Sequence, residues 1–481
     1  MSLRLLYLVL LALPINLLAD EWTVLHPLLP KGTQISYMVV DPVKNKVIAQ
    51  SQQTILRTPA SMLKLLTATA AKLYLSEKFR YRTTIEGKNR NINNNQYQGD
   101  LRVHFVGDPT LLRADIRNML KALKQLGIKE IAGDLLLNQS HFSGYQWSDG
   151  QPWNDLGVCY TAPANAIIVN KNCVLGNLSL SSRNAEKARL FIPEYEPVAI
   201  SSDVSVVTKE QRSKQFCALE LTRNAHNQYH LWGCMVPRKQ PLALAFAVND
   251  PFTYAQQIIA SELAVVGIRL TGKIVLDNSS GTENDLFADV LVSHQSPLLD
   301  KLLQIMMKES DNLIADSLFK TLGAAYFQTA GSFRNGGEAV KQILKEHGID
   351  LGNAYLADGS GLSRHDLMSA ELFMSVLNYV YKNDHKLKLL ASFAVAGVDG
   401  TLKNHRGMRG GLLSGKVIAK TGSMKGVANL LGVVKSKQGD RLFVLILNGY
   451  NEPDPSAGSG KEKANKYLFQ QAFFKTIMEA S

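Results

Sequence analysis

Apolar and polar residues alternate over two short runs near the start of the chain, and a helical pattern follows them. Residues 34–40 and 47–50 have the period of two that is typical of strands, with turn residues between them. Residues 58–60 include a proline suited to the first turn of a helix, and apolar positions then recur as far as Leu75. The pattern predicts a β-hairpin followed by a helix that begins close to Ser61.

Strand patterns separated by turn residues fill the long middle of the chain. They lie at residues 100–106, 131–137, 166–169, 228–232 and 272–276, and helical patterns interrupt them at 111–126 and 253–266. After residue 296 helices return, at residues 298–307, 313–322 and 337–347. The chain closes with strands at 417–423, 427–434 and 441–447 and an amphipathic helix at 461–478.

These elements predict an α+β fold. The N-terminal hairpin and the three last strands would form a five-stranded antiparallel sheet flanked by helices, with two nested, strand-rich inserted domains. We expect a main domain of residues 20–88 and 293–481, an inserted domain II of residues 89–180 and 261–292, and a nested domain III of residues 181–260. The apolar face of the last helix suits a membrane surface or the sheet, and packing on the sheet is the favoured interpretation.

The first residues have the composition of a secretory signal. Arg4 precedes the apolar run 5–13, which is too short to cross a bilayer. We predict cleavage after Ala19 and a periplasmic location, the alternative being an uncleaved anchor. The 53 Lys and Arg exceed the 41 Asp and Glu, which suits an anionic polymer or membrane surface. Nucleic acid is not an expected partner, because no basic arm with interleaved aromatic residues is present.

Four cysteines occur as two local pairs, Cys159 with Cys173 and Cys217 with Cys234. An even number of cysteines in an exported chain favours disulfides, and of the three connectivities we predict the local one. The alternative is four buried thiols. A metal site is not expected, because neither pair has Cys-x-x-Cys spacing and no histidine pair accompanies them.

Three short motifs occur in a fixed order: Ser61-Met-Leu-Lys64, Ser310-Asp311-Asn312 and Lys420-Thr421-Gly422. Such a set supplies a nucleophile from a helix, a proton-relay pair from a loop and a cation from a strand, as in active-site serine acyltransferases of the penicillin-recognising kind. Asp311 is expected to point away from the site. The further match Ser317-Leu-Phe-Lys320 lies after the second motif in a helical pattern, so we interpret it as ordinary helix.

The residue types indicate the chemistry. A serine hydroxyl is a poor nucleophile at neutral pH, so Ser61 needs a base. Lys64 lies one helical turn later on the same face, and partial desolvation beside another cation, Lys420, would lower its pKa enough to accept the proton. Ser310 is expected to relay that proton to the leaving amine, and the Asn312 amide to hold Lys64 and the substrate backbone.

The strand motif suits the carboxylate that ends a peptide. Lys420, Thr421 and Ser423 offer a cation and two hydroxyls, and Gly422 is expected to leave room for a substrate lying along the strand. Backbone N–H groups of Ser61 and Ser423 would hold the oxyanion of a tetrahedral intermediate.

With these motifs the chain resembles the low-molecular-mass class C penicillin-binding proteins, the D-alanyl-D-alanine carboxypeptidase/endopeptidases of the penicillin-binding protein 4 type. Further strings carry the resemblance: Gly107-Asp-Pro-Thr110, Trp153-Asn-Asp-Leu156, Cys159-Tyr-Thr-Ala-Pro163, Ser310-Asp-Asn-Leu-Ile-Ala-Asp316 and Asp358-Gly-Ser-Gly-Leu-Ser-Arg364. The resemblance implies a transpeptidase-like domain with two nested inserted domains, which agrees with the position of Ser310, 246 positions after Lys64.

The resemblance also implies substrates and partners. It implies hydrolysis of D-Ala-D-Ala stem-peptide ends and of D-Ala to diaminopimelate cross-links of peptidoglycan through an acyl-Ser61 intermediate, and acylation of Ser61 by β-lactams. Asp155 and Arg364 would contact the zwitterionic end of a diaminopimelate side chain, with Tyr160 nearby. Lys425 departs from the pattern, which has glutamine there. No cofactor is implied, membrane association would be at most peripheral, and a homodimer is compatible with the sequence.

Two alternatives stay open at this point. A β-lactamase shares the three motifs, although the Glu-x-x-Leu-Asn loop of the class A enzymes is absent from this sequence. A catalytically silent wall-binding scaffold would keep the fold alone, and the intact Ser61, Lys64 and Lys420 argue against it.

Overall fold

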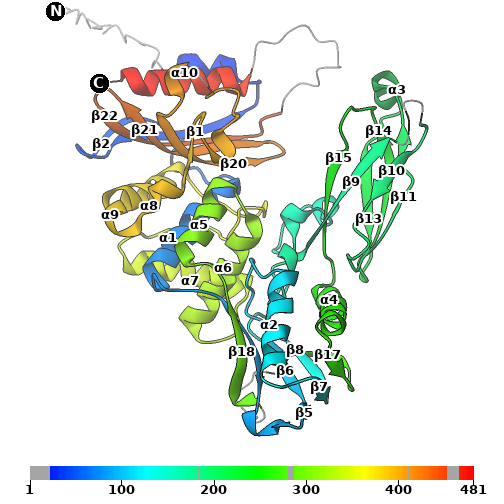
Figure 1. Cartoon of the computed structure of the whole chain (residues 1–481). Coiled ribbons are helices and arrows are strands. Elements are labelled where there is room, and N and C mark those ends of the chain that lie inside the picture. The colour runs from blue at the N-terminus through cyan, green and yellow to red at the C-terminus, as the bar shows by residue number, and fades with distance from the viewer. Residues whose placement is uncertain are drawn as a thin grey trace, which may run out of the picture.

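The computed structural model places three groups of strands along one chain (Figure 1). It describes residues 22–480 except 181, 183–184, 280–286, 410 and 452–464. The predicted signal and its cleavage site after Ala19 lie outside the described residues. Within the described part of the chain, no helix is long and apolar enough to cross a membrane.

The main sheet has six strands in the order β19-β20-β21-β22-β1-β2, all paired antiparallel. They are β1 (Gln34–Asp41), β2 (Lys46–Ser51), β19 (Ala394–Val395), β20 (Val417–Met424), β21 (Val427–Ser436) and β22 (Gly439–Asn448). The five predicted strands are all present. The sixth, β19, has only two residues and is therefore too short to show a period in the sequence.

Helices cover both faces of this sheet, so its central strands are buried on both sides. Along β22, Leu442, Val444 and Ile446 face one core, and Phe443 and Leu445 face the other, as the period of two requires. The first core is formed with α1 (Lys64–Tyr74), α5 (Leu299–Lys308), α6 (Asn312–Phe327), α7 (Phe333–Glu346) and α8 (Ala370–Lys382). The sequence patterns had not indicated α8 or the short α9 (Asp384–Leu387).

The second core lies beneath the closing helix α10 (Lys466–Glu479). Phe469, Phe473, Phe474 and Ile477 are buried there against the sheet, which confirms the packing interpretation of this helix. A membrane-facing orientation would have left these rings exposed. Figure 1 shows α10 lying across the face of the sheet opposite α1, α5 and α8.

The insert begins and ends with two paired strands, β3 (Arg82–Gly87) and β18 (Asp289–Gln295). Its first part has a five-stranded sheet, β17-β8-β6-β3-β18, and a four-stranded sheet, β16-β7-β5-β4. These strands are β4 (Ile92–Asn93), β5 (Gln96–Gln98), β6 (Leu101–His104), β7 (Glu130–Ala132), β8 (Leu135–Asn138), β16 (Arg269–Leu270) and β17 (Ile274–Asp277), with α2 (Arg113–Gln125) and α4 (Pro251–Val266) packed against them.

The second part of the insert is a separate group of strands (Figure 1). It contains the sheets β10-β9-β15 and β11-β14-β12, with β13 paired to β14. Their bounds are β9 (Cys173–Leu180), β10 (Ala188–Phe191), β11 (Ala199–Ser202), β12 (Ser205–Val206), β13 (Leu219–Arg223), β14 (Gln228–Met235) and β15 (Leu242–Ala247), and α3 spans Lys209–Lys214. The predicted α+β fold with a strand-rich insert is confirmed, whereas the exact domain borders stay predictions.

One predicted strand, residues 166–169, was wrong. All four side chains are buried, but the segment belongs to no ladder. Gly107 N donates to Ala166 O at 2.8 Å, and Ile167 N donates to the side chain of Asn165 at 2.8 Å. An apolar run in a sequence indicates only that the segment is buried. The backbone groups of this segment form hydrogen bonds with a loop and with a side chain instead of with a neighbouring strand.

The two local disulfides are present, as predicted. Cys159 is bonded to Cys173 with the Cα atoms 5.4 Å apart, and Cys217 to Cys234 with the Cα atoms 5.9 Å apart. The first links the segment that contains Tyr160 to the start of β9.

Replacing Phe474 by alanine tests the packing of α10. Its ring is fully buried and meets Phe443 edge-on at 4.9 Å between centroids. We expect Phe474→Ala to lower the free energy of unfolding by about 3–5 kcal/mol, measured by denaturant titration. The control Lys475→Ala, on the exposed face of the same helix, should leave it unchanged. Equal stability of the two variants would contradict the packing.

Candidate active site

Ser61 lies on a tight turn that packs closely against two other segments, at Gly361 and at Gly422. It belongs to a 3-10 turn, Ala60–Leu63, directly ahead of α1, and Ala60 has a positive φ of 48°. A Cβ on Gly361 would lie 2.0 Å from Ala60 O, and a Cβ on Gly422 would lie 2.6 Å from Pro59 O. Gly422 was expected to leave room for substrate, but the space beside it is filled by the turn that carries Ser61. Both glycines therefore allow close packing of that turn.

The Lys64 side chain is fully buried behind Ser61 and makes three hydrogen bonds. Its Nζ donates to Ser61 Oγ at 3.0 Å, to Asn312 Oδ1 at 2.7 Å and to Ser360 O at 2.6 Å. Asn312 in turn donates through Nδ2 to Tyr160 O at 2.8 Å. The expected i, i+3 contact between Ser61 and Lys64 is thus formed, and Asn312 lies beside the lysine.

Burial is the main cause of the lowered pKa of Lys64, which falls to about 8. The carboxylates of Asp316 and Asp358 oppose this shift. A contribution from the charge of Lys420 was expected, whereas desolvation lowers the pKa of Lys64 in the structure. Burial also raises the pKa of Asp316 well above its usual value, and the neighbouring Asp358 raises it further.

Lys420 occupies an equivalent buried position behind Ser310. Its Nζ donates to Ser310 Oγ at 2.8 Å and to Thr421 O at 2.9 Å. Burial lowers the pKa of Lys420 well below its usual value, and the nearby charge of Lys64 lowers it further. Two buried lysines thus each hold one of the two serines.

Asp311 points away from the two serines, as expected. Its carboxylate accepts the N–H of Ile314 at 3.0 Å and so caps α6, and it forms an ion pair with Lys171 at 2.7 Å. The three residues of the loop motif therefore have different roles. Ser310 and Asn312 face the lysines, whereas Asp311 fixes the start of α6 and its contact with the insert.

The glycine-rich segment 358–364 is wound around one buried carboxylate. Asp358 accepts hydrogen bonds from the backbone N–H of Ser360, Gly361 and Ser363, at 3.1, 2.6 and 2.8 Å, and from the hydroxyl of Ser148 at 2.9 Å. This geometry aims the carbonyl of Ser360 at Lys64 and places Arg364 at the pocket.

A cavity of 410 Å³ opens in front of the two serines. Predicted site residues line it from five parts of the chain: Ser61, Asp155, Tyr160, Ser310, Asn312, Arg364 and Ser423. Lys64, Lys420, Thr421 and Gly422 do not line it, and Thr421 Oγ1 donates to Thr401 Oγ1 at 3.0 Å. Five further residues line the pocket that were not predicted as site residues: Gln151, Pro152, Thr161, Leu362 and Met424. Thr161 and Leu362 lie inside strings that carried the resemblance, and the other three lie close to such strings or to the strand motif.

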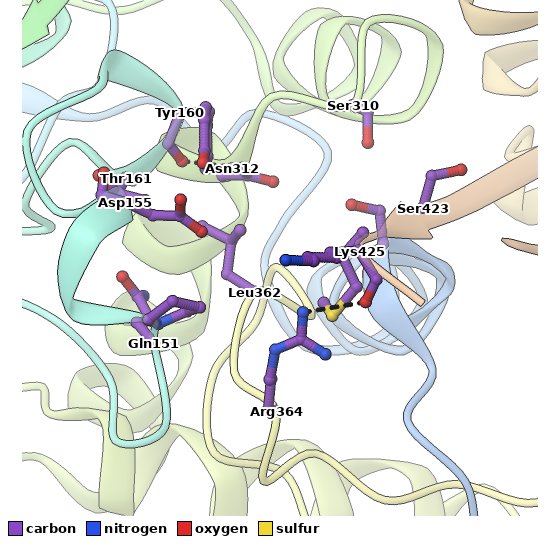
Figure 2. A pocket seen from close by; sticks show the side chains of 13 residues that line it. Gln151, Asp155, Tyr160, Thr161, Ser310, Asn312, Leu362, Arg364, Ser423 and Lys425 are labelled. Atoms are coloured by element: carbon purple, nitrogen blue, oxygen red, sulfur yellow. Dashed lines mark hydrogen bonds between the residues drawn. The ribbon is translucent and has the colours of Figure 1, made fainter. Parts of the chain in front are cut away.

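Opposite charges face one another across this pocket. Figure 2 shows Asp155 and Tyr160 on one side and Arg364 with Lys425 on the other. Arg364 Nη2 donates to Lys425 O at 3.0 Å. Burial and the hydrogen bond with Asp155 raise the pKa of Tyr160 to about 12, so its hydroxyl stays protonated at neutral pH. The walls therefore offer one carboxylate and two cations.

The second Ser-x-x-Lys string lies inside α6, as interpreted from its pattern. Lys320 is buried, and its Nζ donates to Tyr145 O at 3.1 Å and to Ala164 O at 2.9 Å. Its role is thus to join α6 to the insert, and Ser317 does not line the pocket.

No group of three or more His, Cys, Asp or Glu residues in the described ranges could hold a metal ion.

The arrangement of Ser61, Lys64 and the pocket suits nucleophilic catalysis. A hydroxyl with an adjacent buried lysine opens into a pocket with charged walls.

Comparison with known proteins agrees with this geometry. Residues 23–467 match the model of the D-Ala-D-Ala carboxypeptidase 3 (S13) family. The chain is 38% identical over 427 residues to the D-alanyl-D-alanine carboxypeptidase DacB of Haemophilus influenzae, covering 89% of this chain and 88% of that protein.

Solved structures agree with the sequence match. The crystal structure of penicillin-binding protein 4 (dacB) from H. influenzae superposes with a TM-score of 0.88 at 35% identity, covering 95% of this chain and 99% of that one. The same protein complexed with a novel β-lactam gives a TM-score of 0.83 at 34% identity, with the same coverage. The chain belongs to the D-Ala-D-Ala carboxypeptidase 3 (S13) family.

Proposed function

We propose that this protein is a serine DD-peptidase of peptidoglycan that acts in the periplasm. It removes the terminal D-Ala from D-Ala-D-Ala stem peptides and cleaves D-Ala to diaminopimelate cross-links through an acyl-Ser61 intermediate. The main observation in support is that the buried Lys64 Nζ lies 3.0 Å from Ser61 Oγ, at the back of an open pocket. Support comes from relatives that are a D-alanyl-D-alanine carboxypeptidase and a penicillin-binding protein solved with a β-lactam.

Acylation begins when neutral Lys64 accepts the proton of Ser61. The Ser61 oxygen attacks the carbonyl of the penultimate D-Ala, and backbone N–H groups of Ser61 and Ser423 hold the oxyanion. Each such donor contributes about 3 kcal/mol to the stability of the transition state. Ser310, whose hydroxyl Lys420 holds at 2.8 Å, relays the proton from Lys64 to the leaving amine as the peptide C–N bond breaks. Water then hydrolyses the acyl-Ser61 ester, which releases the shortened peptide and restores the serine hydroxyl.

The leaving group explains why one site can cleave two bonds. In a D-Ala-D-Ala end and in a D-Ala to diaminopimelate cross-link, the leaving amine is attached to a D-configured carbon that also carries a carboxylate. Ser423 lines the pocket and Lys420 lies behind it, so we assign this carboxylate to them. Thr421 would contribute once its hydroxyl turns from Thr401.

The charged walls suit a zwitterionic side chain. We assign the ammonium group of diaminopimelate to Asp155 and its carboxylate to Arg364, with the Tyr160 hydroxyl beside Asp155. Lys425 adds a second cation to the same wall and so favours a free carboxylate over an amide.

Replacing Ser61 by alanine tests the nucleophile. We expect Ser61→Ala to abolish both D-Ala release from a pentapeptide and covalent labelling by benzylpenicillin, because no acyl-enzyme can form. Intact-mass spectrometry and peptide mapping measure the adduct, which in the unchanged protein should lie on Ser61. Ser317→Ala is the matched control and should label normally. Release of D-Ala by the Ser61 variant would refute the mechanism, and rapid turnover of a chromogenic cephalosporin would indicate a β-lactamase.

The pH dependence of acylation tests the base. Because the pKa of Lys64 is about 8, lowering the pH below 8 protonates the amine and removes the acceptor for the serine proton. The acylation rate with benzylpenicillin should rise through pH 8 to a plateau and fall about a hundredfold by pH 6. A rate that is flat between pH 6 and pH 9 would exclude Lys64 as the base.

Asp155→Asn tests the side-chain assignment. The variant loses the negative charge that would face the diaminopimelate ammonium group but keeps the size of the side chain. We expect the KM of a diaminopimelate peptide to rise about tenfold, while a peptide whose side-chain amine is acetylated and the acylation by benzylpenicillin change little. An equal loss for both peptides would contradict the assignment.

A further inference from the structure

Arg223 extends from the nested strands of the insert to Trp147 and Trp153, in the segment that supplies one side of the active-site pocket. It is the last residue of β13, and its guanidinium carbon lies 5.2 Å from the centre of the Trp147 ring and 5.0 Å from that of Trp153. Asn249 accepts a hydrogen bond from Nη1 of Arg223. Desolvation by burial lowers the pKa of this arginine below its usual value.

The two tryptophans belong to the segment 147–161, which supplies one side of the pocket. Trp147 Nε1 donates to Thr161 O at 2.8 Å, and Thr161 Oγ1 donates to Asp155 O at 2.8 Å. Thr161 and Asp155 line the pocket. The contacts therefore run from Arg223 through Trp147 to the backbone that carries Asp155.

The nested strands hold the same segment at a second point. Ala247 N, at the end of β15, donates to Gly157 O at 2.9 Å, and a Cβ on Gly157 would lie 2.9 Å from Leu221 of β13. The segment 147–161 thus lies between the nested strands and the pocket. Trp153, in the middle of this segment, is 78% exposed, and Arg223 lies over its ring.

We propose that Arg223 is a positioning residue through which the nested strands of the insert hold Asp155 and its segment in place for the substrate side chain. The proposal rests on the proposed function and gives the nested strands a part in substrate selection. Arg223 does not line the pocket, so it acts through the tryptophans and the 147–161 segment. Nucleophilic attack at Ser61 does not require it.

Arg223→Ala tests the proposal through a split between substrates. We expect the KM of a diaminopimelate peptide to rise about five- to tenfold, as loss of the two ring contacts would produce, with kcat changed much less. The KM of the peptide with an acetylated side-chain amine, and the rate of acylation by benzylpenicillin, should stay within about twofold of the unchanged protein. Arg223→Lys keeps a cation over the rings and should restore most of the lost affinity.

Two further variants separate positioning from stability. Arg189→Ala removes an exposed arginine from β10 of the same group of strands and should change nothing. Trp153→Ser removes a mostly exposed ring and should reproduce the substrate split without unfolding the protein. The double variant Arg223→Ala/Trp153→Ser should be no worse than Arg223→Ala alone, because Arg223→Ala already removes the contact with Trp153.

The outcomes are distinct. An equal rise in KM for both peptides, or an Arg223 variant that behaves like Arg189→Ala, would overturn the proposal. Additive effects in the double variant would also overturn it. Failure of the proposed function would be recognised separately, because the unchanged protein would then not be acylated by benzylpenicillin at Ser61.

Discussion

The burial of the Lys64 amine is the interaction on which the site depends. Three acceptors meet it from three segments: Ser61 on its own turn, Asn312 at the start of α6 and the carbonyl of Ser360. A buried ammonium group without such partners would be strongly unfavourable, so these segments must come together for the lysine to be accommodated. The same burial lowers its pKa to about 8, where it can accept a proton. The burial of this amine therefore both requires the three segments to fold together and allows the lysine to act as a base.

The insert contributes structurally to this centre at several points. Lys171 pairs with Asp311, the carbonyl of Tyr160 accepts from Asn312, and Lys320 binds two carbonyls of the segment 145–164. The inserted residues thus complete one wall of the pocket and also support the loop motif. A compact main domain alone would leave that side open to solvent.

The sequence predicted the parts of the site that depend on local spacing. Ser61 and Lys64 are one turn apart, so their contact follows from helical geometry, and the central strands followed from apolar runs. Gly422 was assigned to the substrate because nothing in its neighbourhood reveals that Pro59 packs against it. The desolvation of Lys64 among buried carboxylates likewise depends on long-range packing. Residues 166–169 are buried without a strand partner, a distinction that an apolar run does not encode.

The antiparallel pairing of β1 with β22 has a consequence for the order of assembly. During synthesis β1 can pair at once with β2, but its other edge has no partner until β22 is made near the end of the chain, whereas β3 and β18, and all the strands between them, can pair earlier. The turn that carries Ser61 lies against β20, so the nucleophile is also in place only at the end. A peptidase built in this way is inert as a nascent chain, and it gains its activity where it completes its folding.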